Sequence, residues 1–526
     1  MGSDAALVVL AIVTAVVLAV VVTVVARRSG WSAPLMLVAL GAIIALFPGV
    51  PAFTIDPDII LYGVLPPLLF SAAMRASLID LRTRRDPILL SSVGLVAFTV
   101  LAVGGVGWLL VPGISVAAAL AFGAVVAPTD QVAVEAVTRR AGMPRMLSTI
   151  LDGENLLNDA TALVALNSAI IAITATITPI QIGVSFVLEV VAGLAGGLVV
   201  GFVLGYVRGK LAAPVLDTSL SLVAPYAAFL LAQVAHGSGA LAVVVAGLYL
   251  GYRAPSFQSA QARVAEELNW RTIQFIVENL VFLLIGLTLP HAVRAAVDSG
   301  IPVWHLVGIA FALLAAVLLS RLIWGIVVTP LFRYGPARMR RVGWPWRTVV
   351  PWTLSGVRGV VTLAAVFLLP ASTPDRAILQ LFAFVIVIGT LLLAIPIPRV
   401  LRAAGLVMTA FDQERIEAEL LMAEAKAAGL ELVRERADEN TDPRVLERLT
   451  ADADFVSASV DAGPTPSGES LNIAYAELRI QLFKAERKAV LQARAEGRYQ
   501  EAAVRKVMHV IDAEETAARV LRHGDN

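Results

Sequence analysis

The feature that most constrains the fold of this chain is a succession of apolar runs, each about as long as a membrane span. A helix of about 20 apolar residues crosses the hydrocarbon core of a bilayer. Hydrophobic residues make up 58% of the 526 residues and charged residues only 15%, which leaves too little polar surface for a soluble domain. We therefore predict an all-α membrane protein with thirteen transmembrane helices, over roughly 5–26, 32–47, 57–78, 87–111, 115–137, 145–175, 181–207, 219–236, 239–252, 268–290, 302–330, 348–369 and 377–398.

Basic residues between these runs predict the orientation of the protein. Lysine and arginine concentrate in cytoplasmic connections, and here they concentrate in every second connection, beginning with the first. That set comprises Arg27, Arg28, Arg75, Arg82, Arg84, Arg85, Arg139, Arg140, Arg145, Arg208, Lys210, Arg253, Arg263, Arg333, Arg338, Arg340, Arg341, Arg347, Arg399 and Arg402. The other connections carry only Arg294 and Arg376. We expect a multi-pass protein of the plasma (inner) membrane, with the N-terminus outside and the C-terminus cytoplasmic. The first run is longer than the apolar core of a signal peptide and its arginines follow it, so we expect a retained helix.

A change of composition divides the chain into a transmembrane domain, residues 1–410, and a tail, residues 411–526. The tail is rich in Glu, Ala, Arg and Leu, which predicts soluble amphipathic helices over roughly 412–437, 443–459, 470–496 and 498–522. Its excess of acidic residues argues against binding of nucleic acid. The tail could regulate the protein by binding a regulator or the cytoplasmic face, could pair with another copy, or could be a solvated appendage. The chain has no cysteine, which excludes disulfides and thiolate metal sites.

Asn158 and Asp159 lie side by side within an apolar stretch, Met143 to Ala175. A carboxylate at the centre of a bilayer costs about 2.5 to 3.5 kcal/mol, so an intramembrane acid is a candidate functional residue. On a helix, Glu154 stacks with Asn158 on one face, and Asn155 stacks with Asp159 on the neighbouring face. The pattern therefore places several oxygen ligands together inside the membrane.

The preceding apolar run adds two more oxygen-bearing side chains, Thr129 and Asp130. A hard monovalent cation such as Na⁺ binds several oxygens, so we predict Asp159, Glu154 and Thr129 as candidate Na⁺ ligands. Burial disfavours the charged form of a carboxylate, so a proton and a cation compete for the same oxygens. If Asp159 alone cycles, one proton exchanges for one monovalent cation and the cycle is electroneutral.

Two apolar runs are interrupted by glycine and proline close to a charge. Gly123 and Pro128 precede Asp130, and the segment 355–359 encloses Arg358. Helix breaks free backbone groups that need partners, and helix ends carry partial charges. Opposite charges at the two breaks therefore indicate crossed half-helices. We expect Arg358 to neutralise either the acidic cluster or the carbonyls at the crossing.

The remaining intramembrane charges are Glu189, Glu278 and Arg321. An unpaired buried charge is costly, so we expect Glu278 and Arg321 to pair. Glu189 has no evident partner. Asp152 follows a basic connection closely, which favours a helix-capping role for it.

Several stretches taken together resemble the monovalent cation/proton antiporter family, in particular the sodium/proton exchanger branch of the electroneutral Asn-Asp type. The stretches are Ala127–Asp130, Gly153–Asp159, Glu278 with Phe282–Gly286, Arg321, Gly356–Gly359 and Leu65–Phe70. The resemblance covers residues 5–402 and not the tail. It implies a transporter and not an enzyme, with no cofactor beyond the transported Na⁺ and H⁺, and it leaves Li⁺ and K⁺ open.

The resemblance implies a thirteen-helix fold with two inverted repeats, a core domain and a dimerisation domain, a homodimer in membrane lipid, and an elevator-like motion. In the family, the residue that matches Asp159 carries the exchanged ion or proton. Asp130, Glu154 and Thr129 match residues that support the site, and Arg358 matches an arginine that stabilises the crossed helices. The Asn-Asp pair marks the electroneutral branch, which implies a part in pH homeostasis.

Three residues depart from the family pattern. Gln131 stands where proline is common, which affects the local break, and Asn155 stands where serine is common, which leaves the ion preference open. Ser71 stands where many members carry glutamate, so a common partner of an arginine is absent. The electrogenic branch has a buried lysine, whereas Lys210, the one lysine of the transmembrane domain, lies in a connection.

Three other classes of membrane protein fit the sequence less well. A channel needs no titratable carboxylate at its centre, and a proton-pumping respiratory subunit relies on buried lysines. An intramembrane aspartyl protease needs Tyr-Asp and Gly-x-Gly-Asp motifs, which the sequence lacks. We therefore predict secondary active exchange of Na⁺, or another monovalent cation, for H⁺ by alternating access.

Overall fold

The structure is a computed structural model that divides into two compact units, Met1–Met408 and Thr409–Asn526. It describes residues 2–29, 32–48, 56–130, 143–174, 179–211, 213–370, 372–406, 471–496 and 501–523, and single residues between 421 and 451. Every regular element within these ranges is a helix. The predicted all-α class is therefore confirmed for the part of the chain that the structure describes.

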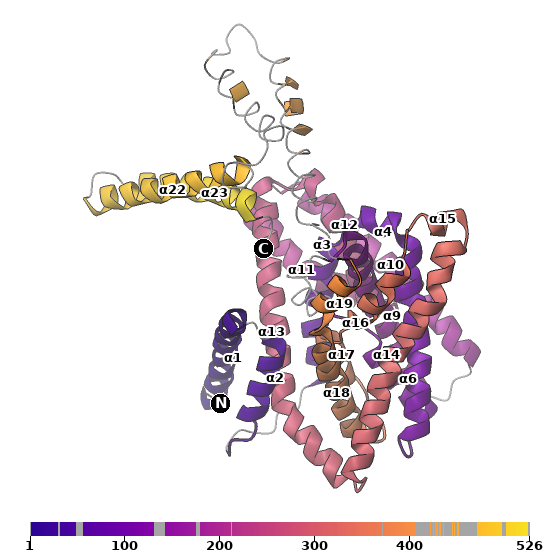
Figure 1. The fold of residues 1–526 in the computed structure, drawn as a ribbon. Coiled ribbons are helices and arrows are strands. Elements are labelled where there is room, and N and C mark those ends of the chain that lie inside the picture. The colour runs from indigo at the N-terminus through magenta and orange to yellow at the C-terminus, as the bar shows by residue number, and fades with distance from the viewer. Residues whose placement is uncertain are drawn as a thin grey trace. The chain divides into compact units, whose positions relative to one another are not determined.

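The first unit is built from helices that follow one another closely along the chain (Figure 1). They are α1 (Gly2–Ser29), α2 (Ala33–Ile44), η1 (Ile59–Val64), α3 (Leu65–Arg75), α4 (Leu78–Thr83), α5 (Arg85–Leu89), η2 (Leu90–Leu95), α6 (Val96–Leu110), α7 (Val116–Val126), α9 (Arg145–Thr174), α10 (Pro179–Arg208), α11 (Pro214–Val234), α12 (Gly239–Phe257), α13 (Ala260–Asp298), α14 (Val303–Tyr334), α15 (Ala337–Arg340), η3 (Trp346–Thr348), α16 (Val349–Leu354), α17 (Val360–Val366), α18 (Arg376–Ala394) and α19 (Ile397–Ala403).

Nine helical stretches among the described residues are long and apolar enough to cross a membrane. They coincide with nine of the thirteen predicted ranges. Three more ranges contain the shorter apolar helices 33–44, 59–75 and 116–126. The last range, 348–369, contains α16 and α17, which are two short helices separated by a break. The number of membrane crossings stays a prediction, because the shorter helices do not meet the length of a span.

Glycine allows two of these helices to approach closely. A Cβ on Gly41 of α2 would lie 2.9 Å from the Cα of Gly286 in α13, and 2.3 Å from the Leu283 carbonyl oxygen. Real Cβ atoms keep about van der Waals distance from backbone, so a side chain at either glycine would push the helices apart. The stretch Phe282–Gly286, which carries part of the resemblance, thus has a packing role against α2.

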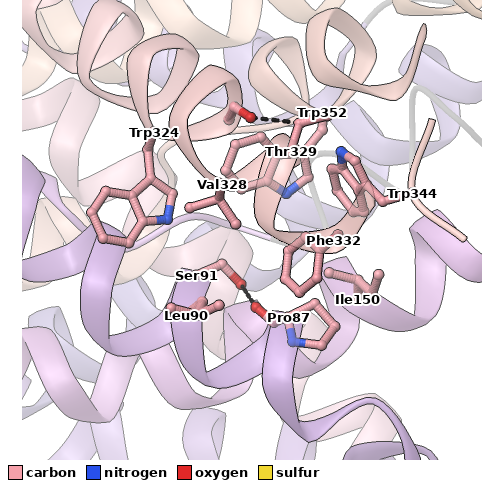
Figure 2. Close-up of a pocket in the computed structure, with 11 residues that line it drawn as sticks. Pro87, Leu90, Ser91, Ile150, Trp324, Val328, Thr329, Phe332, Trp344 and Trp352 are labelled. Atoms are coloured by element: carbon pink, nitrogen blue, oxygen red, sulfur yellow. Dashed lines mark hydrogen bonds between the residues drawn. The ribbon is translucent and has the colours of Figure 1, made fainter. Parts of the chain in front are cut away.

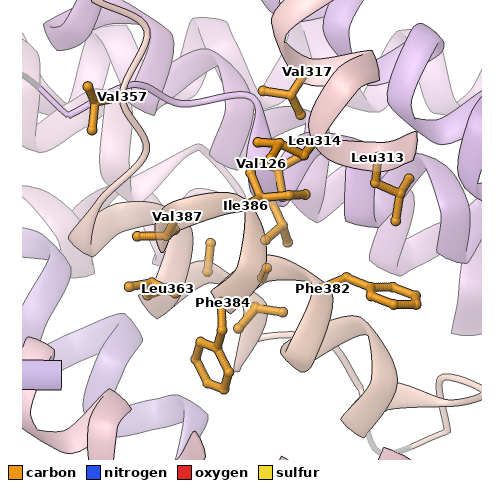
Figure 3. Packing of buried hydrophobic residues seen from close by; sticks show 14 of the residues in the cluster. Val126, Leu313, Leu314, Val317, Val357, Leu363, Phe382, Phe384, Ile386 and Val387 are labelled. Carbon is orange, nitrogen blue, oxygen red and sulfur yellow. The ribbon is translucent and has the colours of Figure 1, made fainter. Parts of the chain in front are cut away.

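A continuous apolar core surrounds the ends of the two broken helices. Figure 3 shows side chains from α7, α14, α17 and α18 in this core, with Val126 at the end of α7 among them. Leu363 of α17 and Ile386 of α18 belong to the same cluster and are 1% exposed or less. Polar groups freed by the breaks therefore have to find partners within the protein, because apolar side chains exclude water around them.

The second unit contains a pair of helices, α22 (Leu471–Ala495) and α23 (Glu501–His523), which match the predicted ranges 470–496 and 498–522. Ile480 and Phe483 of α22 pack with Ile511 and Ala518 of α23. Ion pairs flank this small core. The predicted helices 412–437 and 443–459 lie largely outside the described residues.

Candidate functional site: two crossed helix breaks and an amide–carboxylate cluster

The two predicted helix breaks meet in the structure. α7 ends at Val126 and α16 ends at Leu354, and each is followed by a non-helical segment. The backbone N–H of Asp130, in the first segment, donates to the carbonyl oxygen of Val357, in the second, at 2.7 Å. The breaks therefore cross and pair through their backbones, as the positions of glycine, proline and charge predict.

Opposite charges cap the broken helices at this crossing. Asp130 Oδ2 accepts a hydrogen bond of 3.2 Å from the N–H of Val360, the first residue of α17. Arg358 Nε donates to the carbonyl oxygen of Val126, the last residue of α7, at 2.9 Å. A negative group at a helix N-terminus and a positive group at a C-terminus both interact favourably with the helix dipole. Arg358 also donates to the carbonyl of Gly356, so of the two partners expected for it, it contacts the freed carbonyls.

Gly359 leaves room for the carboxylate of Asp130. A Cβ at this position would lie 1.6 Å from Asp130 Oδ2. A side chain at this position would therefore collide with the carboxylate of Asp130.

Thr129 links the two asparagines of α9. Its hydroxyl accepts a hydrogen bond of 2.8 Å from Asn158 Nδ2 and donates to Asn155 Oδ1. Thr129, Asn155 and Asn158 are 3%, 5% and 1% exposed. The helical spacing that predicts adjacent ligands on α9 thus places both amides against the break after α7.

Three polar atoms in this cluster have no hydrogen-bond partner among the described residues. They are Asn155 Nδ2, Asn158 Oδ1 and Asp159 Oδ1. A buried polar atom without a partner costs about 1–3 kcal/mol, so such atoms in a native protein need an explanation. Two of the three are oxygens, and the charge of Asp159 is also repelled by that of Asp130. The cluster therefore favours a bound cation or proton.

Glu154 is held by two donors from other helices. Arg321 of α14 donates to Glu154 Oε1, and the indole Nε1 of Trp352 donates to Oε2 at 2.9 Å. Arg321 Nε also donates to the carbonyl oxygen of Trp352 at 2.9 Å. Both oxygens of Glu154 are thus engaged by the protein, which favours a supporting role over direct cation binding.

The predicted pairing of Arg321 with Glu278 is wrong. Arg321 pairs with Glu154 because α14 packs on α16, which places its guanidinium beside Trp352 and the start of the Asn-Asp motif. Glu278, on α13, accepts a hydrogen bond of 2.5 Å from Gln274 Nε2. The pairing was inferred from the need of a buried charge for a partner, and sequence spacing cannot decide which of two acids on different helices pairs with Arg321.

Gln274 also explains how the departure at Ser71 is accommodated. Its Oε1 accepts hydrogen bonds from the Ser71 hydroxyl, at 2.9 Å, and from Arg75. Ser71 is fully buried. Gln274 therefore links Ser71 and Arg75 through one amide oxygen. Glu189, for which the sequence indicates no partner, accepts from Asn167 Nδ2 at 2.9 Å.

A second buried polar network was not predicted. Arg208, at the end of α10, donates to Asp217 of α11 at 2.9 Å and to Glu266 of α13 at 2.9 Å. Gln258 Nε2 donates to both carboxylates, at 2.7 and 2.6 Å. The three charged residues are at most 3% exposed. Arg208 looks like an ordinary residue of a basic connection, and only its short spacing from Asp217 could have indicated a pair.

A small cavity lies beside Trp352, on α14, α16 and the start of η2 (Figure 2). Its volume is about 20 Å³, which is room for about one water molecule. Figure 2 shows the aromatic side chains of Trp324, Phe332, Trp344 and Trp352 around it. No carboxylate lines it, so it does not have the ligands of a cation site.

No group of three or more His, Cys, Asp or Glu side chains suited to a metal ion occurs within the described ranges. The departure at Gln131 and the arginines at 139 and 140 fall outside those ranges.

Comparison with known proteins identifies the family of this chain. A family model described as the transmembrane sodium/hydrogen exchanger matches residues 13–403. An uncharacterized Na⁺/H⁺ exchanger of Mycobacterium tuberculosis, Rv2287, is 30% identical over 94% of this chain and 93% of its own. A sodium, potassium, lithium and rubidium/H⁺ antiporter of Bacillus subtilis is 30% identical over 69% of this chain and 56% of its own.

The fold is also similar to that of a solved structure. The sodium proton antiporter MjNhaP1 of Methanocaldococcus jannaschii superposes with a TM-score of 0.59, over 76% of this chain and 98% of that one. The identity is 18%, so this likeness concerns the fold. A family model that covers most of the first unit, together with a relative matched over nearly its whole length, identifies the family. The chain belongs to the sodium/hydrogen exchanger family of multi-pass membrane transporters.

Proposed function

We propose that this protein exchanges Na⁺, or another monovalent cation, for H⁺ by alternating access, and that Asp159 binds either the cation or the proton. The observation that carries the proposal is the unpartnered oxygens of Asp159 and Asn158 beside the crossed breaks. A carboxylate without a fixed donor can take a proton or a cation without first breaking a bond within the protein.

The three acids near the crossing have different partners, which supports Asp159 as the one that cycles. Asp130 accepts from the N–H of Val360 and caps α17. Glu154 accepts from Arg321 and Trp352. Protonation or cation binding at either would compete with these hydrogen bonds. If Asp159 alone exchanges its ligand, each cycle moves one proton against one monovalent cation, and transport is electroneutral.

Thr129 and Asn158 complete the proposed cation site. The threonine hydroxyl accepts from Asn158 Nδ2, which leaves Asn158 Oδ1 free to face a cation. Glu154, a predicted ligand, is assigned a supporting role because both of its oxygens already accept hydrogen bonds.

The identity of the cation is proposed from the relatives. Some are named as Na⁺/H⁺ exchangers, and two are named for sodium, potassium, lithium and rubidium. We propose Na⁺ as a substrate, with Li⁺ and K⁺ as further substrates to be compared in the same assay.

We further propose thirteen membrane crossings in two inverted repeats, in which the two broken spans occupy corresponding places. A homodimer in the plasma (inner) membrane, with the N-terminus outside and a regulatory tail in the cytoplasm, remains part of this proposal. The alternating arginine bias of the connections supports the orientation.

Proteoliposomes with an enclosed pH-sensitive dye test the assignment. A Na⁺ pulse should move protons in the wild-type protein, and Asp159→Asn should abolish this movement while the variant still inserts. Asp152→Asn is the matched control, because Asp152 lies on the same helix but is exposed. Proton movement retained in Asp159→Asn would refute the role of this carboxylate. A Na⁺-coupled current under an imposed voltage would refute the one-for-one cycle.

A further inference from the structure

A polar hollow lies away from the crossed breaks. It is lined by residues at the start of the helical run that begins at Arg85 and by residues that follow α14, which ends at Tyr334. Its volume is about 500 Å³. None of the residues assigned to cation exchange lines it. The lining residues are Thr83, Arg84, Arg85, Asp86, Pro87, Thr149, Arg338, Arg341 and Val342.

Positive charge dominates this hollow. Four of the lining residues are arginines and one, Asp86, is an acid. Asp86 accepts a hydrogen bond of 2.5 Å from Arg338 and lies 4.0 Å from Arg85. One carboxylate balances one guanidinium, so an excess of positive charge faces a single concave space. Such a space concentrates anions.

The donors suit a phosphate group in particular. The guanidinium presents a planar fork of N–H groups that matches phosphate oxygens in pairs. The hydroxyl of Thr149 adds a further donor to the lining, whereas the hydroxyl of Thr83 already donates to the carbonyl oxygen of Ile79 at 3.0 Å. Arg338 is 57% and Arg85 56% exposed at the side chain, so both can reorient toward a ligand without leaving a buried charge behind.

A helix N-terminus opens at the same place. Arg84 is the N-cap of α5, its side chain makes no capping hydrogen bond, and the helical run continues from Arg85 to Leu110. The dipole of this helical run favours an anion at its start. The helix start and the guanidinium groups therefore act on the same space.

We propose that this hollow binds a phosphate group. The hollow lies at the end of two apolar spans where basic residues predict the cytoplasmic side, and basic pockets there bind anionic lipid headgroups. Soluble phosphate offers the same chemistry. The inference does not depend on the transport cycle, because it concerns binding only.

Native mass spectrometry of the full-length protein tests the proposal. The probes are phosphatidylglycerol, with phosphatidylcholine for comparison, and inorganic phosphate. Arg338→Gln with Arg341→Gln should weaken phosphate-dependent binding about tenfold or more, since about 1.4 kcal/mol corresponds to tenfold. Arg333→Gln with Arg340→Gln removes the same charge from the same segment, outside the hollow, and should change binding less than about twofold.

The variant Asp86→Asn keeps the test decisive even if the arginine variants misfold, because a gain of binding is expected from it. This variant removes the competing carboxylate and frees Arg338, so it should bind the probe more tightly than the wild type. Retention of phosphatidylglycerol but not inorganic phosphate assigns a lipid headgroup, and the reverse assigns soluble phosphate. Equal weakening in both double variants, or binding of neither probe by the wild type, would overturn the proposal.

Discussion

The pair formed by Arg321 and Glu154 yields the prediction that the structure specifies most closely. The side chains are 1% and 0% exposed. Replacement of Arg321 by methionine keeps much of the side chain's volume but leaves the carboxylate of Glu154 buried with the Trp352 indole as its remaining donor. Removal of one partner of a buried ion pair costs about 3–5 kcal/mol.

The predicted loss corresponds to a change of about 150-fold to 5,000-fold in the unfolding equilibrium, at 1.36 kcal/mol for each factor of ten. Equilibrium unfolding of purified protein in mixed detergent micelles, followed by tryptophan fluorescence, measures it. The double variant Arg321→Met with Glu154→Gln should recover at least half of the loss. Glutamine is neutral and its amide oxygen can still accept from Trp352.

Glu278 provides the matched control, because sequence reasoning alone pairs it with Arg321. The losses in free energy of unfolding caused by Arg321→Met and by Glu278→Gln should be additive within about 0.5 kcal/mol. Residues without shared contacts rarely couple more strongly than this. The reasoning fails if Arg321 couples to Glu278 as strongly as to Glu154. It also fails if Arg321→Met costs less than about 1 kcal/mol, the range of exposed pairs.

Three further predictions concern the crossing, the amide cluster and the tail. Gly359→Ala should abolish exchange, because its Cβ would lie 1.6 Å from Asp130 Oδ2; the pH-sensitive dye assay measures this. Thr129→Val removes a hydroxyl with two hydrogen bonds and should raise the KM for Na⁺ about tenfold, whereas Thr129→Ser should stay near wild type. Hydrogen bonding from Arg519 holds the pKa of Glu515 below its ordinary value of 4.5. The group therefore stabilises the pair of tail helices above pH 4.5, and this contribution is lost as pH falls through the lowered pKa; hydrogen exchange of residues 471–523 from pH 6 down to 3 tests this.

Each of these predictions has a control within the chain. Gly183→Ala should leave exchange unchanged, because no atom outside the local backbone of its own helix lies within 4 Å of its Cβ position. Normal exchange by Gly359→Ala would contradict the close approach at the crossing. Glu515→Gln should show a smaller loss of protection on acidification than the wild type. An equal loss would place the acid sensitivity of the tail in other carboxylates.

Local pattern predicts those parts of the site that depend on one helix or on one charge beside a break. The helical spacing predicts adjacent oxygen ligands on two neighbouring faces, with Asn158 on one and Asn155 on the other, and in the structure Thr129 bridges the two asparagines. Asp130 and Arg358 mark the breaks, because few other partners can satisfy helix ends inside an apolar core. The need to satisfy these helix ends restricts the residue types at the breaks enough for the sequence to indicate them.

Partners across helices could not be predicted in the same way. Arg321 and Glu154 are 167 residues apart, and only the packing of α14 on α16 selects Glu154 over Glu278. The network around Arg208 was missed for a related reason. An arginine in a short connection usually faces water, and its burial depends on how three neighbouring helices close over it.

Thr129 and Asp130 are consecutive residues with different partners, one in the amide cluster of α9 and one at the start of α17. A single peptide unit therefore joins the groups of the proposed cation site to the groups that hold the opposite half-helix. The short link gives little freedom to adjust one without the other, so a change in the size of the preferred ion has to be matched by a change in the angle between the broken segments. Attempts to alter ion preference should accordingly succeed through paired substitutions on both segments.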